Sequence, residues 1–452
     1  PPIHWFSIYD YIFKNKRNKN TQFGDAKPMD WWRKRHYFRR NTKNGYCIDG
    51  KQFLKEEHLY HHTIYCSGTG GGKSTAIINH LVNIKKSDQY SLFILDVSGE
   101  LEKMVSRHLK EVGYEVSRLD FSNPNESDTY NPLKRATQSD NGIQELAELL
   151  VCPESKGTKS FWEQSAISLI ETLLMGLLSN TQKDESKKNL LGLYNLINLI
   201  TVKPDDAIEF LEQNLDEEHY MDFASFMGLE SKLKSNILAS AKAPLSKLKS
   251  KAIQKLTSTD TIDLSSLRTR KRALFLRLEE GKEKYYRFLL SIFITQLTEM
   301  ALKMPVEGQK YNPIMMFWDE FPSFVVPQFP QWVSVLRKRK VALFIYVQEL
   351  SQIEENYGRN GLKTILGNML NQCYFGNLRR EECERIERLL GTKTEEVNGV
   401  LRAMPTLRAD QIMGHKKFHC LYVNGMDYCV LKILPWFKSA RMRKKVNVQL
   451  KK

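Results

Sequence analysis

The stretch "CSGTGGGKST", from Cys66 to Thr75, decides the fold of this chain of 452 residues. Its glycines allow a tight turn that gathers backbone N–H groups around a phosphate. The preceding "LYHHTIYC" is typical of a short strand and the following "STAIINHLVNIKK" of a helix, so the loop leads into a helix N-terminus. The pattern predicts a phosphate-binding loop, with a glycine-rich linker before Lys-Ser as the alternative.

Each position of the loop has an expected role. Lys73 would reach the β- and γ-phosphates of ATP, and the Ser74 hydroxyl would ligate Mg²⁺. Ser67 stands where the usual motif has a glycine, and a small residue can end a buried strand almost as well. The residues expected to hold the nucleotide are Ser67, Gly68, Thr69, Gly70, Gly71, Gly72, Lys73, Ser74 and Thr75.

Basic residues gather in clusters along the chain, which carries a net charge of +16. This balance favours a polyanionic partner, DNA or an anionic lipid surface. For any single cluster, a solvated face or a disordered tail is the alternative. The clusters are "KNKRNKN" and "RKRHYFRR" before residue 41, the lysines of 231–255, and the terminal "KSARMRKKVNVQLKK".

The spacing of the cysteines and the hydropathy of the chain indicate its redox compartment and its relation to a membrane. Seven cysteines lie scattered, without a Cys-x-x-Cys pair or zinc-type spacing, which favours a reducing compartment over a disulfide or metal framework. No stretch approaches the roughly 18 apolar residues of a membrane span. Because the chain begins with Pro-Pro rather than Met, it stays open whether membrane helices precede it.

The order of strands and helices predicts an interrupted α/β domain. "YSLFILDVSGE" is typical of a strand that ends at Asp96, and a helix and the strand "YEVSRLDF" follow it, which predicts a parallel sheet. From about Gly142 to Lys255 the pattern is helical, and strand signals resume at "RALFLRLEE". The expected divisions are a basic N-terminal arm (1–58), a first nucleotide-binding part (59–141), an inserted all-alpha domain (142–255), a second nucleotide-binding part (256–435) and a basic tail (436–452).

A pair of carboxylates follows a later strand. In "PIMMFWDEFPSF" the apolar run ends in Asp319 and Glu320, at the strand end where open α/β sheets bind ligands. A P-loop hydrolase needs one carboxylate for Mg²⁺ and one to orient or deprotonate the attacking water. Asp319 suits the first role and Glu320 the second, whereas an exposed acidic turn is the alternative.

Three further polar residues flank the strand "VALFIYV". Gln348 ends it, and an amide there could contact both the γ-phosphate and a moving element, unless it is an ordinary strand end. Arg337 and Arg339 precede the strand and could reach a nucleotide held by a neighbouring subunit, since a guanidinium suits a transition-state phosphoryl group. Solvated basic surface is the competing interpretation of the two arginines.

Together these motifs resemble the coupling ATPases of type IV secretion and conjugation systems, the TraG/TraD group, over roughly residues 60–430. One position differs, because the group commonly has Pro-Lys-Gly-Glu where this chain has "DVSGE". The resemblance is carried by the phosphate loop, "WDEFP", "VQELSQIEENYGRNGLKTILGN", "YNPL", "FWEQSA", "LTSTDTIDLSSLRTRKRALFLRLEE", "LLSIFITQL", "LLGT" and "MPTLRADQIM".

The resemblance implies a RecA-like P-loop domain with an inserted all-alpha domain, assembled as a homo-hexamer around a channel. It implies an ATP- and Mg²⁺-dependent enzyme at the cytoplasmic face of the bacterial plasma membrane. The implied substrate is single-stranded DNA with a bound relaxase, or another secreted protein, and the implied partners include the secretion channel. A double-stranded DNA translocase of the FtsK/HerA kind and a docking platform with negligible turnover are the alternatives.

The lysine-rich segment 231–255 adds an expectation for the all-alpha domain. Its lysines alternate with small and apolar residues, a pattern that gives a helix an apolar seam and a basic outer face suited to phosphates. Pro244 would interrupt it, so two shorter helices are expected to meet near "KAPL". The residues are Lys232, Lys234, Lys242, Lys247, Lys249, Lys251 and Lys255 among Leu233, Ile237, Leu238, Leu245 and Leu248.

Overall fold

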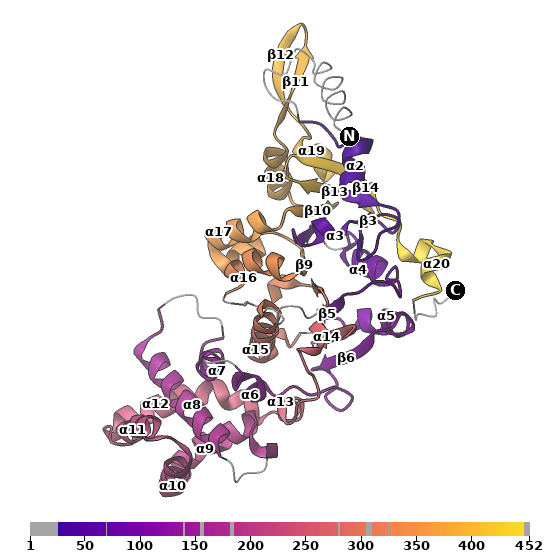
Figure 1. Ribbon diagram of the computed structural model, residues 1–452. Helices are drawn as coiled ribbons and strands as arrows, with labels where there is room; N and C mark the ends of the chain where they lie inside the picture. The colour runs from indigo at the N-terminus through magenta and orange to yellow at the C-terminus, as the bar shows by residue number, and fades with distance from the viewer. Residues whose placement is uncertain are drawn as a thin grey trace, which may run out of the picture.

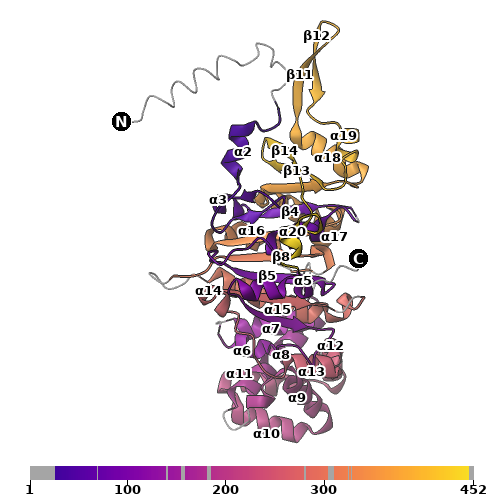
Figure 2. The ribbon, with the colours of Figure 1, turned by 90° about the vertical axis from the view of Figure 1, so that its right-hand side faces the viewer.

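The chain is elongated, with a central sheet between a β-hairpin at one end and a lobe of helices at the other (Figures 1 and 2). The computed structural model describes residues 26–446 except 69, 139–140, 154–157, 181–184, 279–280, 304–309, 324 and 327. None of the helices in this part of the chain is both long and apolar enough to cross a bilayer.

The described residues form a nine-stranded sheet in the order β14-β13-β10-β4-β9-β8-β5-β7-β6. Neighbours from β10 to β6 are parallel, and β13 and β14 add an antiparallel edge. The central strands β5, β8 and β9 are buried along their whole length and consist mainly of apolar residues, as expected for strands covered on both faces. Their bounds are β4 Thr63–Cys66, β5 Ser91–Asp96, β6 Glu115–Asp120, β7 Arg272–Arg277, β8 Ile314–Trp318, β9 Val341–Val347, β10 Asn371–Phe375, β13 His419–Asn424 and β14 Asp427–Lys432.

Alternate side chains of each strand enter separate hydrophobic cores on the two faces of the sheet. In β8, Met316 and Trp318 pack on one face, and Met315 and Phe317 on the other. The first face carries α15 Glu283–Leu302, α16 Phe329–Leu336, α17 Ser351–Asn368, α18 Arg380–Leu390 and α19 Ala409–Met413. The second carries α4 Lys73–Leu81, α5 Glu100–Glu111, α20 Ala440–Arg443 and the N-terminal elements α2 Trp31–Tyr37, β1 Phe38–Arg39, β2 Tyr46–Cys47, β3 Phe53–Leu54 and α3 Glu56–Leu59.

A lobe of helices is inserted between β6 and β7, and its core is continuous with that of the first face. The longest of these helices, α8, begins with a capping box in which Ser160 and Glu163 bond each other's backbone N–H. α12 ends directly after Pro244, in the expected "KAPL" region. The helices are α6 Pro132–Ala136, α7 Gly142–Val151, α8 Phe161–Ser179, α9 Leu190–Val202, α10 Pro204–Asn214, α11 Glu217–Met227, α12 Ser231–Leu245, α13 Lys251–Thr257 and α14 Ser266–Thr269. The exact domain boundaries stay a prediction.

A two-stranded hairpin of β11 Thr392–Val397 and β12 Val400–Pro405 projects beyond the sheet (Figure 2). Asn398 and Gly399 join the strands with positive φ angles of 51° and 76°. Two consecutive residues with positive φ match the twist of antiparallel strands, which explains the Asn-Gly pair.

Candidate nucleotide site

The strand order brings the predicted site residues to one edge of the sheet. β9 lies between β4 and β8, with Cys66 opposite Val347 and Trp318 opposite Ile345. Because all three strands are parallel, the residues that follow them emerge at the same edge. The phosphate loop, the two acidic residues and the glutamine therefore converge.

The glycines of the phosphate loop are needed for two reasons, the backbone conformation at some positions and close packing at others. Gly70 and Gly72 have φ angles of 73° and 122°, and Gly72 is the N-cap of α4. A Cβ on Gly68 would collide with the carbonyl oxygen of Asn377, and one on Gly71 with Ser67 Oγ. No larger side chain fits either position without displacing the loop.

The loop ends in the first turn of α4. The Ser67 N–H donates to the carbonyl of Val347 over 3.1 Å, which ties the start of the loop to β9. Lys73 opens the helix, and Ser74, in its first turn, is exposed. Thr69, predicted to contact nucleotide, lies outside the described residues.

Lys73, Glu320 and Gln348 form one hydrogen-bonded group. Lys73 Nζ lies 3.0 Å from Glu320 Oε1, and Gln348 Nε2 donates to Glu320 Oε1 and Oε2 over 3.4 and 3.5 Å. Only 11% of the lysine side chain is exposed. Glu320 has a φ of 54°, a rare conformation for a residue other than glycine, which turns the chain sharply after β8. The ends of three strands thus meet on one carboxylate.

Asp319 directly precedes Glu320 and is partly buried. The pKa of its carboxyl is raised to about 7, chiefly by burial and then by the negative charges of Glu320 and Asp96, while Lys73 lowers it. A carboxyl group with this pKa loses its proton readily when a cation approaches. Asp319 is therefore chemically suited to hold Mg²⁺.

Asp96, at the end of β5, was given no role by the sequence. Its Oδ2 accepts the N–H of Glu102 over 2.9 Å, so it caps α5, and its charge acts on Asp319. Like Asp319 it ends a fully buried strand, and that shared position is the signal that could have found it.

Arg337 and Arg339 lie at the amino-terminal ends of the parallel strands, opposite the end that carries the phosphate loop. They form the 3-10 helix η4, which immediately precedes β9. The buried Arg268 donates to the carbonyl of Arg339 over 2.9 Å and fixes this turn. The length of β9 separates both arginines from Glu320 within one chain, so the structure does not bring them to the phosphate loop of their own chain. Their action on a neighbouring subunit stays a prediction.

Residues distant in sequence close the loop from the side of β10. Phe375 and Phe418 lie within van der Waals distance of a Cβ placed on Gly72, the ring of Phe375 at 3.5 Å. Asn377, with a φ of 63°, packs against Gly68. No local sequence pattern marks these residues, because their role follows from the pairing of β10 with β4.

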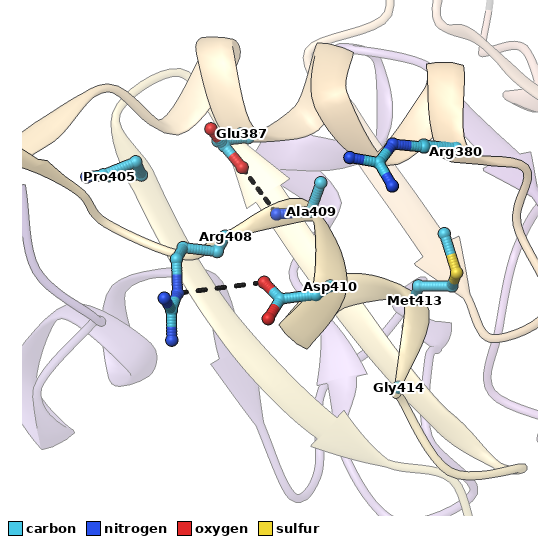
Figure 3. Close-up of a pocket in the computed structure, with 8 residues that line it drawn as sticks. All are labelled: Arg380, Glu387, Pro405, Arg408, Ala409, Asp410, Met413 and Gly414. Atoms are coloured by element: carbon cyan, nitrogen blue, oxygen red, sulfur yellow. Dashed lines mark hydrogen bonds and ion pairs between the residues drawn. The ribbon is translucent and has the colours of Figure 1, made fainter.

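A cavity of about 620 Å³ lies elsewhere, at the base of the hairpin (Figure 3). Its polar groups already contact one another, since Glu387 accepts the N–H of Ala409 and Arg408 Nε lies 3.8 Å from Asp410 Oδ1. Its lining comes from α18, α19 and the end of β12 rather than from the phosphate loop: Arg380, Glu387, Pro405, Arg408, Ala409, Asp410, Met413 and Gly414.

A parallel sheet with a phosphate loop, an acidic pair two strands away and a helical insertion defines a RecA-like P-loop protein with an all-alpha domain. Within that class, the chain belongs to the family described as type IV secretory system conjugative DNA transfer, whose model matches residues 10–411. The resemblance and the fold class read from the sequence are therefore confirmed.

The similar proteins agree with this assignment. Two conjugal transfer proteins TraG of Escherichia coli are each 21% identical to this chain over 76% of its length, and the chain spans 57% of theirs. The bacterial conjugative coupling protein TrwBdeltaN70 with sulphate has a TM-score of 0.71 at 17% identity, covering 93% of this chain and 96% of that one. The plasmid coupling protein TrwB with ADP and Mg²⁺ has a TM-score of 0.70 at 16% identity, covering 93% and 95%. At these identities the structures establish the fold alone.

Proposed function

We propose that this chain is an ATPase that couples nucleotide hydrolysis to the transfer of a protein-bound DNA substrate into a type IV secretion channel. The observation that carries the proposal is the group formed by Lys73, Glu320 and Gln348 beside the phosphate loop. A lysine, a carboxylate and an amide from three strand ends are the parts that phosphoryl transfer to water requires.

The residues present fit ATP and Mg²⁺. Gly68 and Gly71 stand where a Cβ would collide with neighbouring atoms. Because these positions carry no side chain, the backbone N–H groups of the loop can approach phosphate oxygens. The Ser74 hydroxyl and the Asp319 carboxylate would hold Mg²⁺, which when bound neutralises charge on the phosphates. TrwB, one of the similar proteins of known structure, was solved in complex with ADP and Mg²⁺, which supports this assignment.

Each residue of the group has a distinct task. Lys73 supplies a positive charge to the β- and γ-phosphates. The Glu320 carboxylate, 3.0 Å from Lys73 Nζ, competes with the phosphates for this charge. Glu320 orients water and accepts its proton. Gln348, which bonds Glu320 and ends β9, links the state of that carboxylate to the strand.

The partners follow from family membership and charge. We propose single-stranded DNA carrying a relaxase, or another secreted protein, as substrate, and channel components and further copies of this chain in a homo-hexamer as partners. The net charge of +16 supports a polyanionic substrate, and the conjugative family supports a place at the cytoplasmic face of the bacterial plasma membrane.

Turnover of Mg-ATP with and without DNA tests the proposal. Lys73→Ala should abolish hydrolysis, whereas the matched control Lys86→Ala, on an exposed loop after α4, should leave it unchanged. Nucleotide binding and turnover at wild-type levels in Lys73→Ala would refute the motor. Efficient translocation on naked duplex would favour an FtsK/HerA-like translocase, and tight binding with negligible turnover a docking platform.

A further inference from the structure

The helix α2 presents two adjacent tryptophans to solvent. Trp31 and Trp32 are 56% and 58% exposed, and their ring centroids lie 4.6 Å apart, edge to face. Contiguous apolar side chains exposed on a folded domain mark interaction surfaces. The exposed area of these two indoles therefore makes α2 a candidate binding surface.

The helix is firmly attached to the sheet by its other face. The Met29 N–H donates a hydrogen bond to the carbonyl of Tyr428. Arg33 and Tyr37 each donate a hydrogen bond of 2.9 Å to the carboxylate of Asp427. These contacts hold α2 against the turn between β13 and β14. The tryptophans therefore project from a fixed support, close to a turn whose Met426 is 68% exposed.

Positive charge accompanies the apolar side chains. Arg35 stacks on Trp31, with Cζ 4.5 Å from the ring centroid. Asp427 is already paired with Arg33, and Asp30 caps the helix, so the acidic groups on α2 and its supporting turn have local partners. The ring of His36, on α2, contacts that of His58, on α3. The neighbouring Glu57 is exposed, and its carboxylate contacts Lys55 and His58. We call the α2 surface the exposed residues Trp31, Trp32, Arg35, Arg39, Arg40 and Met426.

We propose that the α2 surface binds an anionic lipid bilayer directly. Indole rings prefer the level of the lipid head groups, methionine enters the acyl region, and arginines attract anionic head groups. Single-stranded DNA is the other candidate, but a run of stacked bases needs free and roughly parallel ring faces. Arg35 covers one face of Trp31, and the planes of the two indoles lie at 82° to each other, so consecutive stacked bases cannot lie on both rings. A bilayer has no such requirement.

The opposite end of the molecule supplies a matched control. Phe161 and Trp162, at the start of α8, are also exposed, at 60% and 40%, with ring centroids 5.2 Å apart. Nearby Lys159 is paired with Glu148. Figure 2 places α8 in the helical lobe, whereas α2 lies on the hairpin side of the sheet. The two aromatic pairs differ in the arginines beside them.

Flotation of the whole chain with vesicles of phosphatidylcholine, with and without phosphatidylglycerol, tests the proposal. The wild type should bind the anionic vesicles and be released by salt. Trp31→Ser/Trp32→Ser should weaken this binding by about tenfold or more, while Phe161→Ser/Trp162→Ser binds like the wild type. Arg35→Ser/Arg39→Ser/Arg40→Ser should lose the preference for phosphatidylglycerol.

Two further measurements make the outcome decisive. Thermal unfolding and Mg-ATP turnover should be the same in all variants, since the α2 surface lies outside the nucleotide site. Wild-type vesicle binding by the tryptophan variant, or none by the wild type, would overturn the proposal. So would loss of single-stranded oligonucleotide binding with vesicle binding intact, which would assign the surface to DNA. None of these results depends on whether the chain is an ATPase.

Discussion

The nucleotide edge of the sheet and the lysine-rich part of the helical lobe use charge in opposite ways. At the edge, Lys73 is almost covered and meets a carboxylate beside the buried Asp319. In the lobe, most lysines lie at the surface and several contact other parts of the same chain. Lys234 donates to the carbonyl of Met227, Lys242 to Thr201, Lys255 to Asn125, and Lys247 lies over the ring of Phe288.

This difference predicts where mutation has large effects. Burial lowers the effective dielectric, so changing one charge at the edge alters every interaction around it. Exposed charges are screened by water and salt, and each contributes little. Substitutions in the two regions therefore test this contrast.

Glu320→Gln should bind ATP but hydrolyse it about 10²–10⁴ times more slowly, because the amide keeps the shape and loses the base. Nucleotide affinity should not fall, since the neutral amide no longer competes for Lys73. Single-turnover hydrolysis and nucleotide titration measure the two effects. The control is Glu354→Gln, an exposed residue of α17, and normal turnover in Glu320→Gln would place the catalytic carboxylate elsewhere.

Arg337→Ala and Arg339→Ala test whether the opposite edge of the sheet serves a neighbouring subunit. Loss of one transition-state donor should lower turnover about 10²–10³-fold while ATP still binds. In the wild type, turnover per subunit should rise steeply with protein concentration or with DNA, and the variants should lack this rise. Lys338→Ala, in the same turn, is the control. Concentration-independent activity of a monomer would exclude the role in trans.

Asp319 predicts a pH dependence. A carboxyl whose pKa is higher in the folded chain holds its proton more tightly there. Its contribution to stability is therefore full below about pH 4, the unfolded value, and lost as the pH rises through about 7. Without Mg²⁺, Asp319→Asn should raise the melting temperature by a few degrees, about 2–5 °C, above pH 7, by less near pH 5 and hardly at all below about pH 4.

The same residue should make wild-type turnover fall as the pH drops through about 7, because protons compete with Mg²⁺ for the carboxylate. Raising the Mg²⁺ concentration should shift this fall to lower pH. Asp410→Asn, an exposed residue of α19, is the control for both measurements. A stability difference that does not change with pH would contradict the assignment.

The parts of the site that the sequence predicts are those fixed by local patterns. Buried strands that end in Asp319 and Gln348, and glycines before Lys73, specify their positions because strand ends of a parallel sheet converge. The pairing of Lys73 with Glu320, and the closure of the loop by Asn377, depend on segments hundreds of residues apart. No short pattern encodes such contacts.

The lobe shows the same limit. Periodicity identifies its helices and the basic side of 231–255, but whether a lysine faces solvent or a neighbouring helix depends on tertiary packing. Lys234 and Lys255 are examples, since each bonds a residue outside its own helix. By contrast, the Asn-Gly pair at 398–399 is a local signal for the hairpin of β11 and β12.

The smallest expected effect belongs to the exposed lysines of the lobe. Lys232, Lys249 and Lys251 are exposed, unlike the partly covered Lys234, and they are the ones best placed to meet phosphates. Neutralising them together should leave basal hydrolysis intact, because none of the three belongs to the phosphate loop or to the residues that contact it. Binding of a single-stranded oligonucleotide should weaken only a few-fold, about 2–5-fold at physiological salt.

The slope of log affinity against log salt should become shallower by about 0.7 for each phosphate that the variant no longer neutralises, since fewer counterions are released. The matched control for net charge neutralises three exposed lysines on or before α5: Lys86, Lys103 and Lys110. Parallel salt slopes and equal affinity in the lobe variant would mean that its lysines are only a solvated face, and the DNA-binding surface would then have to lie in the basic segments near the two ends of the chain.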